Sequence, residues 1–167
     1  MHIHPPIMLL HLPDESATRA LGAALARFIE PGCIIYLSGP LGGGKTTLVR
    51  GLLAGFGHTG AVKSPTFSLI EPYVLSRLNF YHFDLYRLKT PEEWDESGFR
   101  EYFEGRSISL IEWPEKALAQ LPGADLWLTF VVSAEGRDVT IEAATERGNQ
   151  CRLQLERNLP PNVARAT

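Results

Sequence analysis

The feature that most constrains this chain is the segment 39–46, which reads Gly-Pro-Leu-Gly-Gly-Gly-Lys-Thr. It fits the phosphate-loop (P-loop) pattern G-x-x-x-x-G-K-[ST] at every fixed position. Such a loop turns its backbone N–H groups inward around an anion, and a side chain at a glycine position would block the phosphates. Lys45 is then placed to reach phosphate oxygens, and the Thr46 hydroxyl to bind Mg²⁺.

The residues on either side of the loop give it the context that the chemistry needs. Residues 34–37 form a short apolar run typical of a buried strand, and apolar residues recur at helical spacing over 48–56. Strand, glycine loop and helix therefore follow one another, with the positive end of the helix dipole directed at the anion. This arrangement predicts an α/β protein that binds a nucleoside triphosphate.

The composition of the chain limits which binding partners and which cellular location we expect. The net charge of −3 over 167 residues argues against a broad basic surface, so we expect no binding to DNA and no direct binding to RNA. No apolar run reaches the length of a membrane span and no signal-peptide pattern opens the chain, so no membrane contact is expected. Cys33 and Cys151 lack metal or redox spacing, which favours a reducing, cytoplasmic location.

Two acidic residues, Asp84 and Glu112, each come directly after a strand-like apolar run. Acids at the carboxyl ends of strands beside the P-loop strand are placed to bind Mg²⁺ or to orient the attacking water. Together with Lys45 they form the predicted catalytic group. An ion pair with Arg87, three residues on, is the alternative for Asp84, and residue types do not separate direct metal contact from contact through water.

Two further segments allow more than one interpretation. Ser64-Pro65-Thr66 lies where P-loop proteins carry a switch that senses the γ-phosphate, but the same triplet is common in ordinary turns. His82 and the aromatic residues around it fit either a base-stacking surface or a partly buried sheet face.

The pattern as a whole predicts a single-domain α/β fold of the P-loop NTPase type, a three-layer sandwich with a mixed central sheet and a C-terminal hairpin. Residues 1–145 are expected to form the P-loop ATPase domain, and the polar, proline-containing residues 146–167 a partly disordered tail. The expected elements are a helix starting at Asp14 or Ser16, strands at 67–70, 78–83 and 108–111, helices from Thr90 and over 99–103, and a hairpin of 126–133 with 138–144.

Four linked segments resemble one known family. They are 39–47, 64–67, 82–87 (His-Phe-Asp-Leu-Tyr-Arg) and 111–114 (Ile-Glu-Trp-Pro). In order and spacing they are similar to the bacterial TsaE family, the ATPases of tRNA threonylcarbamoyladenosine synthesis. The resemblance covers residues 12–144, which makes it far more specific than the P-loop alone.

The resemblance implies ATP and Mg²⁺ as cofactors and slow ATP hydrolysis. It also implies the partner proteins TsaB and TsaD, which install threonylcarbamoyl on adenosine 37 of tRNA, so that tRNA is reached through them. Thr46 and Glu112 would hold Mg²⁺, and Asp84 would support hydrolysis. The implied nucleotide-site residues are Glu15, Gly42, Gly43, Gly44, Lys45, Thr46, Thr47, Ser64, Thr66, Trp113 and Arg137.

The chain departs from the usual family pattern at Pro40 and Gly43, where an acidic or amide residue and an alanine are common. Three consecutive glycines are expected to make the empty loop more mobile.

Proteins with other functions also contain a P-loop and are alternatives to a TsaE-like ATPase. A small-molecule kinase would add an arginine-rich lid and a GTPase an N-K-x-D sequence, and the chain has neither. A further alternative is a non-catalytic scaffold that binds the nucleotide without hydrolysing it, and only an activity assay would distinguish it from an ATPase.

Overall fold

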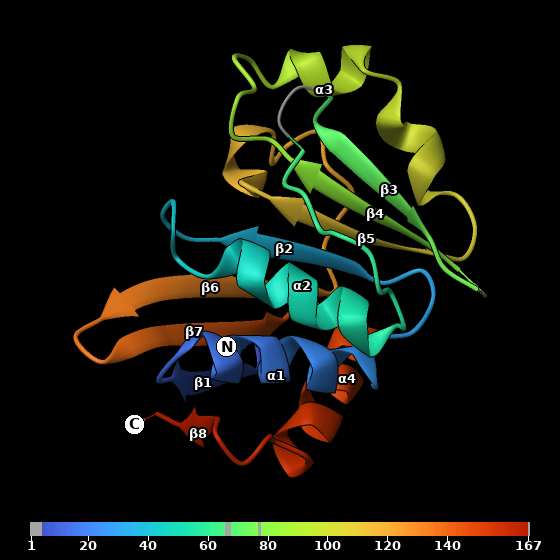
Figure 1. The fold of residues 1–167 in the computed structure, drawn as a ribbon. Coiled ribbons are helices and arrows are strands. Elements are labelled where there is room, and N and C mark those ends of the chain that lie inside the picture. The colour runs from blue at the N-terminus through green and yellow to red at the C-terminus, as the bar shows by residue number, and fades with distance from the viewer. Residues whose placement is uncertain (1–4, 66–67, 77, 167) are drawn as a thin grey trace.

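A central sheet with helices on both faces organises the chain (Figure 1). The computed structural model describes residues 5–65, 68–76 and 78–166. Within these residues the strands are β1 (Ile7–Leu12), β2 (Ile34–Ser38), β3 (Ile70–Val74), β4 (Asn79–Asp84), β5 (Ser107–Glu112), β6 (Leu126–Ser133), β7 (Gly136–Ala143) and β8 (Ala164–Arg165). The helices are α1 (Glu15–Ala26), α2 (Lys45–Gly55), α3 (Glu92–Glu96) and α4 (Glu146–Arg157), with 3₁₀ turns at Phe99–Phe103 and Pro114–Lys116.

The sheet is mixed, with the strand order β3-β4-β5-β2-β6-β7-β1-β8. Strands β4, β5, β2 and β6 pair in parallel, whereas β3, β7 and β8 pair antiparallel with their neighbours. Because β1 is antiparallel to β7, it runs in the same direction as the parallel strands. The carboxyl ends of five strands therefore lie at one edge of the sheet, where ligands bind in open α/β folds.

Two apolar clusters fill the space between the layers. The larger cluster joins one face of the sheet to α1, α2 and α4, and the smaller one joins the other face to Trp94 of α3 and to the 3₁₀ turn at Phe99–Phe103. Neighbouring residues alternate between the two, since Ile35 and Leu37 of β2 belong to the larger cluster and Tyr36 to the smaller. This arrangement confirms the expected single-domain three-layer α/β fold.

Most of the expected elements are confirmed. The Asp14 carboxylate caps α1 by accepting a hydrogen bond from the N–H of Ala17 at 2.8 Å. The hairpin is β6 with β7. The strand expected at 67–70 is misplaced, because β3 runs over Ile70–Val74 in the register set by pairing with β4, and Thr66 and Phe67 lie outside the described residues. Strand β1 was not foreseen at all.

The expectation of a partly disordered tail over 146–167 is wrong for residues 146–166. Thr145 caps α4 by accepting a hydrogen bond from the N–H of Gly148, and β8 pairs with β1. Cys151, Leu155 and Val163 are buried in the larger apolar cluster, so a few well-spaced apolar side chains order a polar segment. Residue 145 is therefore no domain boundary. Across the described residues, no helix combines the length and the apolar character that crossing a bilayer requires.

Candidate functional site

A cavity of about 400 Å³ opens at the edge of the sheet where the parallel strands end. The P-loop, the start of α1, the ends of β4 and β5 and the start of β7 form its walls. The predicted residues that line it are Glu15, Gly42, Gly43, Gly44, Lys45, Thr46, Thr47, Ser64, Asp84, Glu112, Trp113 and Arg137. Thr66 lies outside the described residues. The fold therefore brings together segments that are far apart in the sequence.

The P-loop has the backbone conformation that its glycines allow. Gly39, Gly42 and Gly44 have φ angles of 142°, 73° and 106°, which L side chains rarely adopt. A Cβ at Gly39 would also lie 2.9 Å from the carbonyl oxygen of Phe130. Helix α2 then starts at Lys45, and Gly44 provides no side-chain cap. The first N–H groups of α2 thus remain available to an anion in the cavity.

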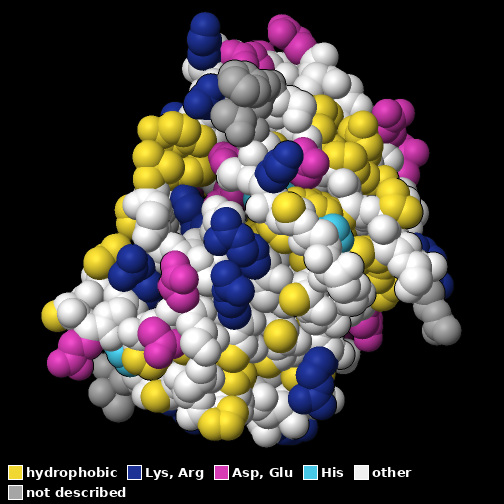
Figure 2. Space-filling model, in the orientation of Figure 1, with side chains coloured by type: hydrophobic (Ala, Val, Ile, Leu, Met, Phe, Trp, Pro, Cys, Tyr) yellow, Lys and Arg dark blue, Asp and Glu magenta, His cyan; other side chains and the backbone are white. Residues whose placement is uncertain are grey.

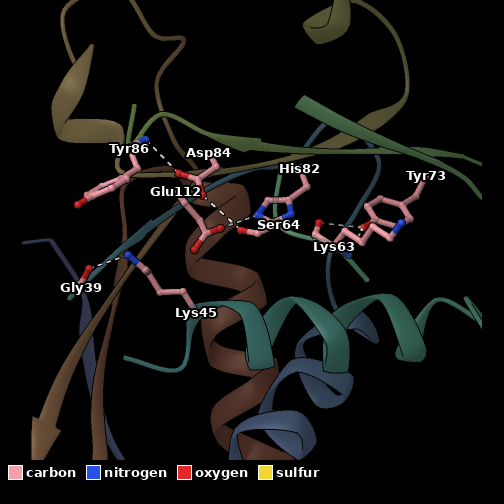
Figure 3. Close-up of polar contacts among 9 residues, drawn as sticks. All are labelled: Gly39, Lys45, Lys63, Ser64, Tyr73, His82, Asp84, Tyr86 and Glu112. Atoms are coloured by element: carbon pink, nitrogen blue, oxygen red, sulfur yellow. Dashed lines mark hydrogen bonds and ion pairs between the residues drawn. The ribbon is translucent and has the colours of Figure 1, made fainter. Parts of the chain in front are cut away.

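Lys45 is buried at the wall of the cavity, with only 5% of its surface exposed. Its Nζ donates a hydrogen bond to the Gly39 carbonyl at 2.6 Å (Figure 3). The same atom lies 4.0 Å from the centre of the Trp113 ring. Burial lowers the pKa of Lys45, while the carboxylates of Glu112 and Asp84 act in the opposite direction. These carboxylates help to keep the Lys45 side chain positively charged at the wall of the cavity.

Asp84 and Glu112 are paired neighbours on the parallel strands β4 and β5, so their side chains project from the same face. Asp84 accepts hydrogen bonds from the backbone N–H of Tyr86 at 3.0 Å and from the Ser64 hydroxyl at 3.3 Å. Burial raises the pKa of Asp84, partly offset by the bond from Tyr86. The hydrogen bond to Ser64 connects the acidic pair to the segment interpreted as a switch.

Glu112 is 2% exposed, and its Oε2 lies 2.7 Å from Nε2 of His82, which is fully buried. The base-stacking interpretation of His82 is therefore wrong, because no ligand reaches a ring inside the protein. Sequence reasoning missed this contact, although one signal was present. His82 stands two residues before Asp84, and in a strand that spacing places both side chains on one face.

Arg137, which was expected in the hairpin turn, is the second residue of β7 and connects the start of this strand to the P-loop. One guanidinium nitrogen donates to the carbonyl of Gly42 at 3.1 Å and another to that of Gly136 at 2.9 Å. Asp14 and Thr18 of the α1 region also line the cavity, and sequence reasoning did not select them. Their place in the wall depends on how α1 packs against α2.

A family model described as "Threonylcarbamoyl adenosine biosynthesis protein TsaE" matches residues 12–140. The chain belongs to the TsaE family. The resemblance found in the four sequence segments is thereby confirmed.

Individual TsaE proteins match over most of their length. The chain is 43% identical to the tRNA threonylcarbamoyladenosine biosynthesis protein TsaE of Haemophilus influenzae, over 83% of this chain and 90% of the relative. It is 35% identical to the protein of the same name from Bacillus subtilis, over 87% and 90%. A solved structure described as Bacillus subtilis YdiB superimposes with a TM-score of 0.79 and 29% identity, covering 95% of this chain and 99% of that one.

Proposed function

We propose that this TsaE protein binds ATP with Mg²⁺ in the cavity and hydrolyses it slowly, in support of the TsaB–TsaD machinery that places threonylcarbamoyl on adenosine 37 of tRNA. One observation carries the proposal. The P-loop, Lys45 and the paired acids Asp84 and Glu112 all line the same cavity. Its volume of about 400 Å³ lies in the usual range for small-molecule sites.

Phosphate binding follows from groups that are already in place. The P-loop and the first turn of α2 line the cavity, so their unpaired N–H groups can bind an anion there, and Lys45 adds a full positive charge beside them. Each charge-assisted hydrogen bond to phosphate is worth roughly 1.5–3 kcal/mol. The Lys45 ammonium would leave its present contact with the Gly39 carbonyl, or share it, in order to reach the phosphates.

The donor set at the cavity fits Mg²⁺. Thr46, Asp84 and Glu112 offer hydroxyl and carboxylate oxygens, the ligands that this ion prefers. Magnesium in nucleotide sites is held by one or two protein oxygens together with phosphates, so a larger cluster of protein ligands is not needed. Thr46 and Glu112 would hold the ion, which when bound would help to neutralise the charge on the reacting phosphate.

Hydrolysis also requires an oriented water molecule and neutralisation of the transition-state charge. Asp84 is suited to the first task, because Tyr86 and Ser64 fix its carboxylate at the edge of the cavity. Arg137 is the one arginine among the described residues that line the cavity, and its guanidinium is bound to two carbonyls. An arginine directed at the γ-phosphate can increase the rate of hydrolysis by about 10³–10⁵. Because Arg137 is held by these carbonyls, we expect the protein alone to hydrolyse ATP slowly and the partners to accelerate it.

Contact with tRNA is proposed to run through TsaB and TsaD. Figure 2 shows acidic and basic side chains intermixed over the face that carries α1 and α2. The net charge of −3 also argues against direct binding of tRNA by this chain.

The test is steady-state ATP hydrolysis by the whole protein, alone and with TsaB and TsaD, paired with calorimetric ATP binding. Glu112→Ala is expected to reduce hydrolysis more than binding, because metal and water positioning matter most in the transition state. Glu96→Ala, at an exposed acid of α3, is the matched control and should behave as wild type. Fast turnover that the partners do not change, or no ATP binding at all, would overturn the proposal.

A further inference from the structure

Beneath the cavity, the side chain of His82 stands against the inner side of Glu112 (Figure 3). The two come from the neighbouring parallel strands β4 and β5, and their side chains are 0% and 3% exposed. Glu112 lines the cavity, whereas His82 does not. The histidine therefore touches the inner side of a carboxylate whose other side is open to ligand.

The direction of this hydrogen bond follows from the chemistry of the two groups. An ionised carboxylate only accepts, so Nε2 of His82 must carry the proton and donate it to Oε2 of Glu112. The bond occupies one oxygen of the carboxylate. Figure 3 shows the Glu112 carboxylate between the imidazole ring and Lys45, so the second oxygen is left for the cavity side.

Apolar packing alone does not explain the presence of a histidine at this position. Nδ1 of His82 is buried and has no hydrogen-bond partner among the described residues. Its neighbours on the same side, Phe80 and Leu110, belong to the apolar cluster, where a leucine would pack without the unpaired Nδ1 but would offer Glu112 no donor. What the ring does provide is one donor aimed at Glu112.

We propose that His82 is the positioning residue of Glu112. Its Nε2–H holds Oε2, fixes the rotamer of the carboxylate and keeps the other oxygen directed at Mg²⁺ or at the water that Mg²⁺ carries. This inference rests on the proposed function of the site. Groups that hold a metal-binding side chain from behind are typically worth about 10- to 100-fold in metal affinity or activity.

The test compares two substitutions of the same residue. His82→Leu fills the space without a donor, and His82→Gln places an amide N–H close to the position of Nε2. We expect His82→Leu to lower kcat by about 10- to 100-fold and Mn²⁺ affinity similarly, and His82→Gln to recover most of both. Mn²⁺ affinity is measured on the complex with a non-hydrolysable ATP analogue, from the loss of the free-ion resonance signal.

Two controls separate positioning from folding. ATP affinity in EDTA reports on the P-loop alone and should stay within about twofold of wild type in His82→Leu, since no phosphate ligand is removed. His11→Leu removes the histidine of a second histidine–carboxylate pair, His11 with Asp138 at 2.8 Å, and should change neither measurement.

Unchanged kcat and Mn²⁺ affinity in His82→Leu would overturn the inference. So would an equal loss of ATP affinity in EDTA, because that pattern marks a folding defect. A wild-type protein that binds no ATP would instead refute the proposed function, and the inference would fall with it.

Discussion

The close contact between α1 and α2 gives a prediction whose sign is decided by the structure. At the crossing, Gly51 of α2 lies against the backbone of Arg19 in α1, and Gly22 of α1 lies against the backbone of Leu48. A Cβ on Gly51 would lie 2.2 Å from the carbonyl oxygen of Arg19, and one on Gly22 would lie 2.5 Å from that of Leu48. Both neighbours are helix backbone, which cannot rotate out of the way as a side chain can.

Two opposing effects set the size of the change in Gly51→Ala. Alanine inside a helix gains about 1 kcal/mol over glycine from its propensity alone. Against this, an ordinary contact begins at 3.4 Å, so the helices would need about 1.2 Å more room. Overpacking of a tight core costs about 1–3 kcal/mol, and a clash with backbone belongs at the upper end. We expect Gly51→Ala to lose about 2 kcal/mol, a fall in Tm of about 4–8 °C.

The assay is urea unfolding followed by circular dichroism, together with calorimetric ATP binding. Gly123→Ala is the matched control, because a Cβ there meets nothing within 4 Å. Gly51→Ala should also weaken ATP binding, since α1 contributes Glu15 and Thr18 to the cavity wall and α2 contributes Lys45. In the double variant with Gly22→Ala the two costs should not add, because separating the helices relieves both contacts.

A Gly51→Ala protein that is more stable than wild type by about 1 kcal/mol would refute the reasoning. That result would mean that helix propensity alone acts at this position and that the two helices separate at no cost.

Two further predictions concern Lys45 and the cysteines. Lys45→Ala should weaken ATP binding by roughly 1.5–3 kcal/mol, about ten- to a hundredfold by calorimetry. The control Lys89→Ala, at an exposed lysine, should leave ATP affinity unchanged. Unchanged affinity in Lys45→Ala would show that Lys45 is not part of the ATP site. Burial raises the pKa of both Cys33 and Cys151, from 9.0 to about 12 for Cys151. At pH 8 that shift alone should slow the reaction of Cys151 with Ellman's reagent about 1,000-fold relative to protein in urea, and rapid labelling of the native protein would contradict it.

Much of the candidate site was predictable from the sequence. The P-loop with Lys45 and Thr46 is a contiguous pattern, and the acids Asp84 and Glu112 end strands that apolar runs mark out. The resemblance to TsaE added Glu15 and Arg137, which the cavity contains. The P-loop and the two acids could be recognised from residues that are close together in the chain. Glu15 and Arg137 could be recognised only because their positions match the family pattern.

Tertiary structure decided the rest. The His82–Glu112 contact depends on the pairing of β4 with β5, and the proximity of Arg137 to Gly42 depends on where the β6–β7 turn ends. The tail over 146–166 became α4 and β8 because burial of a few side chains outweighed its polar composition. Local patterns predicted most of the helices and strands, but not β1, α4 or β8. Which of them meet is decided by strand register and by packing between residues far apart in the chain, and no local pattern records that.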